Sequence, residues 1–444
     1  MTRFTEVDQE LNARGFTRMV FDLSRIEGLL DSLGSPQRAY PAIHLTGTNG
    51  KTSTARMIDS LLRAHGLRTG RYTSPHLQSI TERISIEGEP ISEERFVEVY
   101  EEVAPLAEYL DATAAAESGA PLTYFDMTTA MAFAAFADAP VDVAVVEVGL
   151  GGADDSTNVL QAQTTVITPI GLDHTEWLGD TIEEIAWAKA GIVHKGSKLI
   201  CALQPEEAMR PILERCAEVG ATVAREGREF GVVNRDLAVG GQVLTLQGLS
   251  GVYEGIFLPL HGEHQAQNAA VALAAVEAFL GAGAERALNA ESVRDGFAGV
   301  TSPGRLERVR NSPPILLDAA HNAHGMQATV RALTEEFAFS GLVAVVAALA
   351  DKDVEGMLEL LEPITESIVV TRNSSPRGMP VAQLAQIAEE LYGGDRVRVV
   401  PELPDAIDAA VTLAESDNAV PGTVGILVTG SVVTVADARG LLKR

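Results

Sequence analysis

The chain has 444 residues, more than one hydrophobic core usually serves, and we therefore expect two domains. Its 61 acidic residues exceed its 34 basic residues and give a net charge of −27, which argues against nucleic acid and anionic membrane surfaces as partners. Two cysteines, a polar first segment without a signal-peptide core and no apolar run of membrane-spanning length predict a cytoplasmic protein, and we expect a monomer.

The segment 43–62, IHLTGTNGKTSTARMIDSLL, carries the strongest functional pattern in the chain. An apolar strand-like run enters a glycine-rich turn, and a helical pattern begins directly after it. This order predicts a phosphate-binding loop in which backbone amides meet phosphate oxygens, Lys51 adds a positive charge and the Thr52 hydroxyl can bind Mg²⁺. The alternative is an ordinary strand–turn–helix corner with a surface lysine, since Leu45 stands where a full P-loop has its first glycine.

Strand-like and helical stretches alternate over residues 1–298, which favours an α/β domain with a P-loop-type, doubly wound, mainly parallel sheet. The expected strands are Ala42–Leu45, Val141–Val148, Thr165–Ile170 and Lys198–Ala202. The expected helices are Ser92–Ala107, Met127–Ala137, Thr181–Ala190 and His264–Leu280. Short β-type runs within 230–258, separated by glycine turns, predict a small antiparallel appendage.

Residues 299–304 contain turn-forming residues and no periodicity, and we place the linker between the two domains there. Over 305–444 the alternation of strands and helices restarts, and it predicts a smaller, Rossmann-like α/β domain. Its expected strands are Ile315–Leu317, Leu342–Ala347, Ser367–Val370, Val397–Val400 and Gly425–Val428.

Polar side chains follow two expected strands of the first domain. Glu147 ends an apolar strand just before a glycine-rich turn, and Asp173 and His174 follow the next strand. Ligands of open α/β sheets bind beyond the carboxyl ends of the strands, so we expect Glu147 and His174 to hold Mg²⁺ together with hydroxyl and phosphate oxygens. The alternatives are an exposed glutamate at a strand end and an ordinary loop histidine.

Lys189 lies on a mostly apolar helix, where a lysine either extends its amine to water or has a buried partner. The loop 71–77, RYTSPHL, presents two hydroxyl groups and is by itself only a turn. In the second domain Asp318 ends a strand, with His321 just beyond it. Arg305 at the linker is suited to contact a phosphate because its guanidinium binds oxyanions with two parallel hydrogen bonds.

Together these motifs resemble the folylpolyglutamate synthase and dihydrofolate synthase family, within the Mur ligase superfamily. They occur in family order from about residue 22 to residue 432, so the resemblance covers nearly the whole chain. The matching stretches are SLGSPQRAYPAIHLTGTNGKTST, TSPHL, EVGLGG, TNV, GLDHTEWLG, AKAGI, HQAQNA, PGRLE, DAAHN and DKD.

The resemblance implies a role for each matching position. The implied ATP-binding residues are Asn49, Gly50, Lys51, Thr52, Asn268, Arg305 and Asp318. The implied Mg²⁺ ligands, for one or two ions, are Thr52, Ser74, Glu147 and His174. The implied pterin-binding residues are Thr73, Ser74, Thr123, Phe125 and Asp126. Lys51, a carbamylated Lys189 and His321 are the implied catalytic residues.

The implied reaction is ATP-dependent addition of L-glutamate to dihydropteroate, to the γ-carboxylate of a folyl-(poly)glutamate, or to both, through an acyl phosphate. The first domain would bind ATP and folate, the second would be the glutamate-ligase domain, and closure would occur about 299–304. The chain departs from the family pattern at Ala153, Ala188 and Ala319, where arginine, glutamate and glycine are usual. The rival interpretations are a peptidoglycan Mur-type ligase and a regulatory P-loop ATPase.

Overall fold

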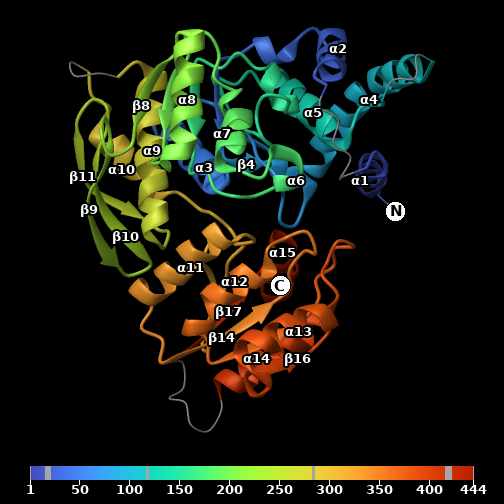
Figure 1. Ribbon diagram of the computed structural model, residues 1–444. Coiled ribbons are helices and arrows are strands. Elements are labelled where there is room, and N and C mark those ends of the chain that lie inside the picture. Colours follow the sequence, from blue (N-terminus) through green and yellow to red (C-terminus); the bar gives the residue numbers. More distant parts are fainter. Residues whose placement is uncertain (1, 16–21, 117–119, 283–285, 416–422, 444) are drawn as a thin grey trace. The chain divides into compact units, whose positions relative to one another are not determined.

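The computed structural model describes residues 2–15, 22–116, 120–282, 286–415 and 423–443 (Figure 1). Its contacts divide the chain into two compact units. The first unit comprises Met1–Asp236, Val243–Leu258 and Ala266–Val300. The second unit comprises Leu237–Gln242, Pro259–Gln265 and Thr301–Arg444. The second unit therefore includes two short segments that precede residue 300, which a linear division of the sequence leaves out.

The first unit is built on an eight-stranded sheet in the order β4-β3-β2-β5-β1-β6-β7-β8. The pairs from β2 to β8 are parallel, and β3 and β4 add an antiparallel edge. The strands are β1 Ala42–Thr46, β2 Thr69–Tyr72, β3 Ile84–Ile86, β4 Glu89–Pro90, β5 Val143–Glu147, β6 Thr164–Ile167, β7 Lys198–Cys201 and β8 Thr222–Arg225. The predicted doubly wound, mainly parallel sheet is confirmed.

Helices cover the sheet of the first unit. Helices α7 and α8 pack against each other, as the green ribbons of Figure 1 show, and α3 packs against α10. The helices are α1 Arg3–Ala13, α2 Ser24–Ser32, α3 Lys51–Ala64, α4 Glu93–Ala116, α5 Tyr124–Asp138, α6 Thr175–Leu178, α7 Ile182–Ala190, α8 Glu206–Val219, α9 Glu263–Leu280 and α10 Ala290–Ala298. Short 3₁₀ turns are η1 Pro36–Arg38, η2 Ile80–Arg83 and η3 Ser156–Val159.

Two elements of the first unit differ from the sequence prediction. Helix α4 continues well past the predicted end at Ala107, with Pro105 inside it. Proline removes one helical hydrogen bond, and a long helix held by packing tolerates that loss. Arg71 and Tyr72, predicted to lie in a loop, instead end the buried strand β2. The charge of Arg71 concealed this strand, because only the folded structure supplies the carboxylate that pairs with it.

The predicted appendage is a separate three-stranded sheet in the order β11-β10-β9. Its strands are β9 Gly231–Ala238, β10 Gly241–Gln247 and β11 Val252–Leu258. The buried carboxylate of Glu277, on α9, accepts hydrogen bonds from the Ser250 amide at 3.2 Å and the Tyr253 hydroxyl at 2.9 Å. This carboxylate fixes the turn between β10 and β11 to the helix.

The second unit contains a six-stranded sheet in the order β12-β13-β17-β14-β15-β16, in which only the β12–β13 pair is antiparallel. Its strands are β12 Glu307–Asn311, β13 Pro314–Leu317, β14 Gly341–Val346, β15 Ser367–Val370, β16 Val397–Val399 and β17 Val424–Thr429. Its helices are α11 Ala323–Glu336, α12 Val354–Leu361, α13 Val381–Tyr392, α14 Leu403–Ala414 and α15 Val432–Leu442, with 3₁₀ turns η4 Glu362–Ile364 and η5 Gly394–Arg396. The predicted smaller α/β domain is confirmed.

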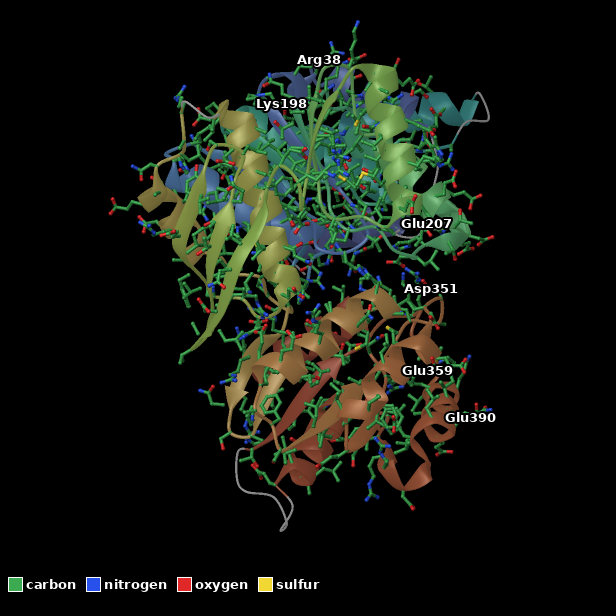
Figure 2. The ribbon with its side chains drawn as sticks, turned by 60° about the vertical axis from the view of Figure 1, so that its left-hand side comes forward. Arg38, Lys198, Glu207, Asp351, Glu359 and Glu390 are labelled. Atoms are coloured by element: carbon green, nitrogen blue, oxygen red, sulfur yellow. The ribbon has the colours of Figure 1, made fainter. Side chains whose placement is uncertain are left out.

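Acidic side chains lie on the surface of both units. Glu207 of the first unit and Asp351, Glu359 and Glu390 of the second are exposed (Figure 2). In the described part of the chain, every helix is too short or too polar to cross a lipid bilayer.

A buried ion pair joins α3 to β2 inside the first unit. The Asp59 carboxylate, on α3, lies 2.8 Å from a guanidinium nitrogen of Arg71, and it also accepts a hydrogen bond from the Thr69 hydroxyl. Asp59 is fully buried, and Arg71 is 3% exposed and donates a further hydrogen bond to the Ser85 hydroxyl at 3.0 Å. The pair holds the helix after the phosphate loop against the strand that leads to the TSPHL loop.

We predict that Asp59→Asn destabilises the protein by about 3–5 kcal/mol, because it leaves the Arg71 charge buried without its partner. Urea-induced unfolding of the full chain measures the change. Asp138→Asn is the matched control: Asp138 pairs with Arg95 at the surface, and its loss should cost no more than about 1 kcal/mol. Equal effects of the two substitutions would contradict the prediction.

Candidate active site

The predicted phosphate loop connects β1 to α3. The backbone amides of Thr48 and Asn49 both donate to the Pro169 carbonyl, at 3.0 and 3.3 Å, which ties the loop to the segment after β6. Gly50 is the N-cap of α3 and has a φ of +85°, a conformation that glycine adopts without strain. The first amides of α3 are therefore placed at a helix N-terminus, the arrangement that binds phosphate.

Two glycines of this loop cannot be replaced without a clash. A Cβ atom on Gly47 would lie 1.9 Å from the Thr168 hydroxyl oxygen, and one on Gly50 would lie 2.5 Å from the side-chain oxygen of Asn268. Asn268 is buried on α9, so the structure brings this predicted ATP-binding residue to the phosphate loop.

Lys51 and Lys189 converge on one carbonyl oxygen. The amine of Lys51 donates to the carbonyls of Gly47 and Thr48, both at 3.0 Å, and the amine of Lys189 donates to the Gly47 carbonyl at 2.9 Å. Lys189 is 4% exposed, so it has a buried partner and does not extend to water. Burial, followed by the neighbouring charge of Lys51, lowers the pKa of Lys189 to about 7.

Glu147 lies beside the start of α3, at the end of β5. The Thr52 hydroxyl is 3.0 Å from both carboxylate oxygens of Glu147, and the Ser74 amide donates to the same carboxylate at 3.4 Å. Glu147 is 1% exposed. Three of the four residues predicted to bind Mg²⁺ thus come together, and the Thr52 hydroxyl and Glu147 carboxylate oxygens suit this hard cation.

His174 occupies the next strand end, after β6, as predicted. It is exposed and has a φ of +52° at the N-cap of α6, and its imidazole lies 3.9 Å from the Asp173 carboxylate. Across the described residues, no group of three or more histidine, cysteine, aspartate or glutamate side chains is arranged to hold a metal ion. The predicted set contains only two such residues and depends on hydroxyl and phosphate oxygens for the remainder.

The glycine-rich turn after Glu147 is held by a carboxyl group that the sequence analysis passed over. Asp155 accepts hydrogen bonds from the Leu150 amide at 2.8 Å and the Thr157 amide at 3.0 Å. Burial raises the pKa of Asp155 to about 6. The Ala153 amide then donates to the Ala188 carbonyl at 2.9 Å, which joins the turn to the helix that carries Lys189. The clue in the sequence was an aspartate soon after a strand-end glycine turn.

The predicted pterin-binding residues Thr123 and Asp126 form the N-terminal capping box of α5, each side chain accepting from the other's amide, and Asp126 pairs with the guanidinium of Arg25 at 3.3 Å. Their spacing is a sequence signature of helix capping, so both residues have a structural role in addition to the predicted one. Phe125 is partly buried, with its ring 5.9 Å from that of Tyr72. Thr73, also predicted, is buried at the end of β2.

In the second unit, Asp318 positions the turn that contains Arg305. Its buried carboxylate accepts from the Leu306 amide at 2.9 Å, the Ala320 amide at 3.0 Å and the Thr329 hydroxyl at 2.8 Å. The nearby His321 imidazole contacts the Ala319 carbonyl at 2.9 Å. The structure thus brings the predicted residues of this unit to one end of its sheet, where β13 ends.

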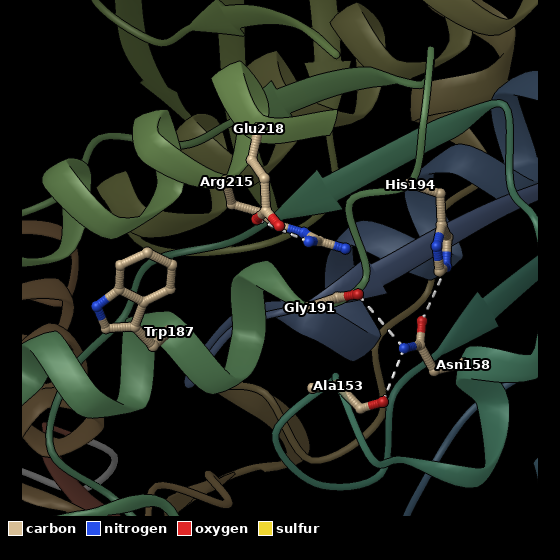
Figure 3. A pocket seen from close by; sticks show the side chains of 7 residues that line it. All are labelled: Ala153, Asn158, Trp187, Gly191, His194, Arg215 and Glu218. Carbon is tan, nitrogen blue, oxygen red and sulfur yellow. Dashed lines mark hydrogen bonds and ion pairs between the residues drawn. The ribbon is translucent and has the colours of Figure 1, made fainter. Parts of the chain in front are cut away.

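A separate hollow of about 330 Å³ lies beside the glycine-rich turn of the first unit (Figure 3). Asn158 anchors its wall by donating to the carbonyls of Ala153 and Gly191, at 2.9 and 3.3 Å, and its amide oxygen lies 3.0 Å from the His194 ring. Trp187, which is 41% exposed, lines it as well. Ala153 thus lines the hollow from the side of the turn that follows Glu147.

Comparison with known proteins identifies the family. Residues 45–276 match the Mur ligase middle domain, and residues 304–432 match the Mur ligase glutamate ligase domain. A dihydrofolate synthase/folylpolyglutamate synthase of Mycobacterium tuberculosis is 53% identical over 96% of this chain and 91% of that protein. The chain belongs to the folylpolyglutamate synthase and dihydrofolate synthase family of Mur ligases.

Other members of the family agree with this assignment. A dihydrofolate synthase/folylpolyglutamate synthase of Bacillus subtilis is 35% identical over 95% of both chains. The solved structure of Mycobacterium tuberculosis folylpolyglutamate synthase complexed with ADP has a TM-score of 0.95 and 52% identity, covering 100% of this chain and 98% of that chain. The family resemblance inferred from the sequence motifs is confirmed, and the chain is a carbon–nitrogen ligase that uses ATP.

We predict that Gly47→Ala destabilises the first unit by roughly 1–3 kcal/mol and weakens ADP binding, because the new methyl group collides with Thr168 and forces the loop backbone to move. Thermal unfolding and isothermal titration calorimetry measure the two effects. Gly28→Ala, on helix α2, is the control: apart from its chain neighbours and the backbone of its own helix, no atom lies within 4 Å of a Cβ there, and alanine favours the helix. ADP binding by Gly47→Ala at the level of Gly28→Ala would contradict the prediction.

Proposed function

We propose that this ligase adds L-glutamate to dihydropteroate, to the γ-carboxylate of a folyl-(poly)glutamate, or to both. The acid's carboxylate oxygen attacks the γ-phosphorus of ATP, the bond to the ADP oxygen breaks, and an acyl phosphate forms. The glutamate amine then attacks the acyl carbon, loses a proton and expels phosphate, which leaves the amide.

One observation supports this proposal most strongly. A helix N-terminus with Lys51 lies directly beside a buried carboxylate, and the Thr52 hydroxyl bridges the two at 3.0 Å. Phosphoryl transfer depends mainly on positioning and charge neutralisation, which these groups supply. The protein's net charge of −27 increases the need for local cations at such a site.

We propose that Thr52, Ser74, Glu147 and His174 hold Mg²⁺, at one or two positions. The oxygen-rich donor set around Glu147 fits this ion, and an exposed imidazole at the adjacent strand end can add one nitrogen ligand. When bound, Mg²⁺ would neutralise charge on the phosphate oxygens. Thr52 and the Ser74 amide keep the Glu147 carboxylate oriented.

We assign the other predicted residues by their places in each unit. The residues that would bind ATP in the first unit are Asn49, Gly50 and Lys51 of the phosphate loop and Asn268, which lies beside Gly50. The acid substrate's pterin ring would lie against Phe125, whose flat side chain is suited to stacking. The other residues proposed to line the acid site are Thr73, Ser74, Thr123 and Asp126. Those of the second unit proposed to bind nucleotide or glutamate are Arg305, Asp318 and His321.

We propose that Lys189 is carbamylated. Carbon dioxide reacts only with a neutral amine, and burial has already lowered the pKa of this one to about 7. The product is a carboxylate in place of an ammonium group, and it would stand close to Lys51, which shares the Gly47 carbonyl with Lys189. An attractive pair would thus replace the repulsion between the two ammonium groups, which is one cause of the lowered pKa of Lys189.

We further propose a monomer that acts on small molecules in the cytoplasm. Both cysteines, Cys201 and Cys216, are free and buried, and burial raises the pKa of each thiol, to about 12 and about 11. Neither thiol is therefore poised for oxidation, and two unpaired cysteines are what a protein of a reducing compartment such as the cytoplasm is expected to have.

We predict that Lys51→Ala abolishes glutamate-dependent ADP release while the thermal unfolding temperature stays within a few degrees of wild type. Lys195→Ala, at an exposed lysine, is the control and should retain full activity. Release of ADP is measured with and without glutamate, with either dihydropteroate or tetrahydrofolate as the acid, and products are weighed by mass spectrometry. ADP release by wild type that needs neither acid nor glutamate would refute the ligase reaction and favour a regulatory ATPase.

We predict that activity rises between pH 6 and pH 8, and rises further with added bicarbonate. Lys189 is mostly protonated at pH 6 and mostly neutral at pH 8, because its pKa is about 7, and only the neutral amine forms a carbamate. Carbon-13 NMR with labelled bicarbonate should show a carbamate signal that is lost in Lys189→Ala. That variant should be nearly inactive, with partial rescue by acetate; the absence of the signal in wild type at pH 8 would exclude the modification.

A further inference from the structure

Arg56 lies one helical turn beyond Thr52 on α3. Residues four apart share a face of a helix, and Thr52 uses this face to contact Glu147 at 3.0 Å. The charges of Glu147, at the end of β5, and of Glu82, just after the loop that follows β2, both act on Arg56, which agrees with a position on this face of α3. It is partly buried, between residues that are fully buried on either side, Ala55 and Met57.

The guanidinium of Arg56 has no hydrogen bond or ion pair with any residue in the described ranges of the chain. Three carboxylates, those of Glu82, Asp59 and Glu147, are near enough to attract its charge. Another buried guanidinium, that of Arg71, is near enough to repel it. Arg56 therefore stands among charged groups without being bonded to any of them.

Each of the three carboxylates is already used by other donors. Asp59 accepts from Thr69 and Arg71, as described above, and Glu147 accepts from Thr52 and Ser74. Glu82 is held by the backbone of the loop before η2. Its oxygens accept from the amides of Leu77, Gln78 and Ser79, at 2.9, 3.1 and 3.2 Å.

An arginine in this condition is costly for the unbound protein. Burial, followed by the charge of Arg71, lowers the pKa of Arg56 to about 10, so the group still carries its full charge at neutral pH. A partly buried cation without a hydrogen-bonded partner opposes folding, and an incoming anion would relieve that cost. The chain has a strong excess of acidic residues, so most of its cations could pair with a carboxylate. Arg56 forms no such pair, and a role in balancing surface charge therefore does not explain it.

We propose that Arg56 binds the carboxylate of the acid substrate, the group that receives the phosphoryl group from ATP. This inference rests on the proposed function. Lys51 and the first amides of α3 already serve the phosphates at the helix N-terminus, whereas Arg56 lies a turn further along, on the side of the Ser74 loop assigned to the acid. Its planar guanidinium fits a carboxylate with two parallel hydrogen bonds.

The test compares Arg56→Met and Arg56→Lys with wild type. For Arg56→Met we expect the KM of the acid substrate to rise about 10- to 100-fold, with the KM values of ATP and glutamate changed less than threefold. Arg56→Lys keeps the positive charge but cannot form two parallel hydrogen bonds to a carboxylate. Its KM for the acid should fall between those of wild type and Arg56→Met. Arg68→Met is the control. Arg68 is exposed, and its ion pair with Glu87 is long, at 3.8 Å, so the substitution should leave every KM unchanged.

Thermal stability separates binding from a structural role. Removing a cation that has no partner should leave the unfolding temperature of Arg56→Met equal to or above that of wild type, whereas loss of a structural contact would lower it. An unchanged KM for the acid, or a rise confined to ATP, would overturn the proposal for Arg56. Wild type that shows no acid-dependent ADP release would instead refute the proposed function, so the two failures are distinguishable.

Discussion

The parallel pairing of β1 with β5 on one side and β6 on the other is the constraint on which the active site depends. It places three strand ends in a row, with Leu45 of β1 opposite both Glu147 of β5 and Val166 of β6. The phosphate loop leaves the central strand, the buried carboxylate ends one neighbour, and the loop with His174 follows the other. Because the sheet is hydrogen-bonded throughout, these groups keep their spacing without a ligand to hold them.

Much of this arrangement was readable from the residues. Glu147 stood out because a carboxylate directly after a fully apolar strand has no packing role, and the glycines and lysine of the phosphate loop fall where oxyanion binding requires them. The strands of both sheets were found where they are apolar on both faces. Strand β2 was missed because it contains an arginine. The partner of this arginine, Asp59, lies on the preceding helix α3, and only the folded structure shows that the two side chains meet.

A role that depends on which hydrogen-bonding groups are already occupied could not be predicted from the sequence. Arg56 is one cation within an ordinary amphipathic helix until the structure shows that every nearby carboxylate is already bonded to something else. Asp318 was found as a carboxylate at a strand end, and its contact with a ligand stays a prediction. The sequence could not show that its carboxylate also accepts from three internal donors and so shapes the turn containing Arg305.

The hollow at Ala153 has a consequence for how two segments of the active site can move. Asn158, one of its lining residues, donates to the carbonyls of Ala153, in the turn after Glu147, and of Gly191, directly after the helix that carries Lys189. A displacement of this one amide would therefore loosen both segments together.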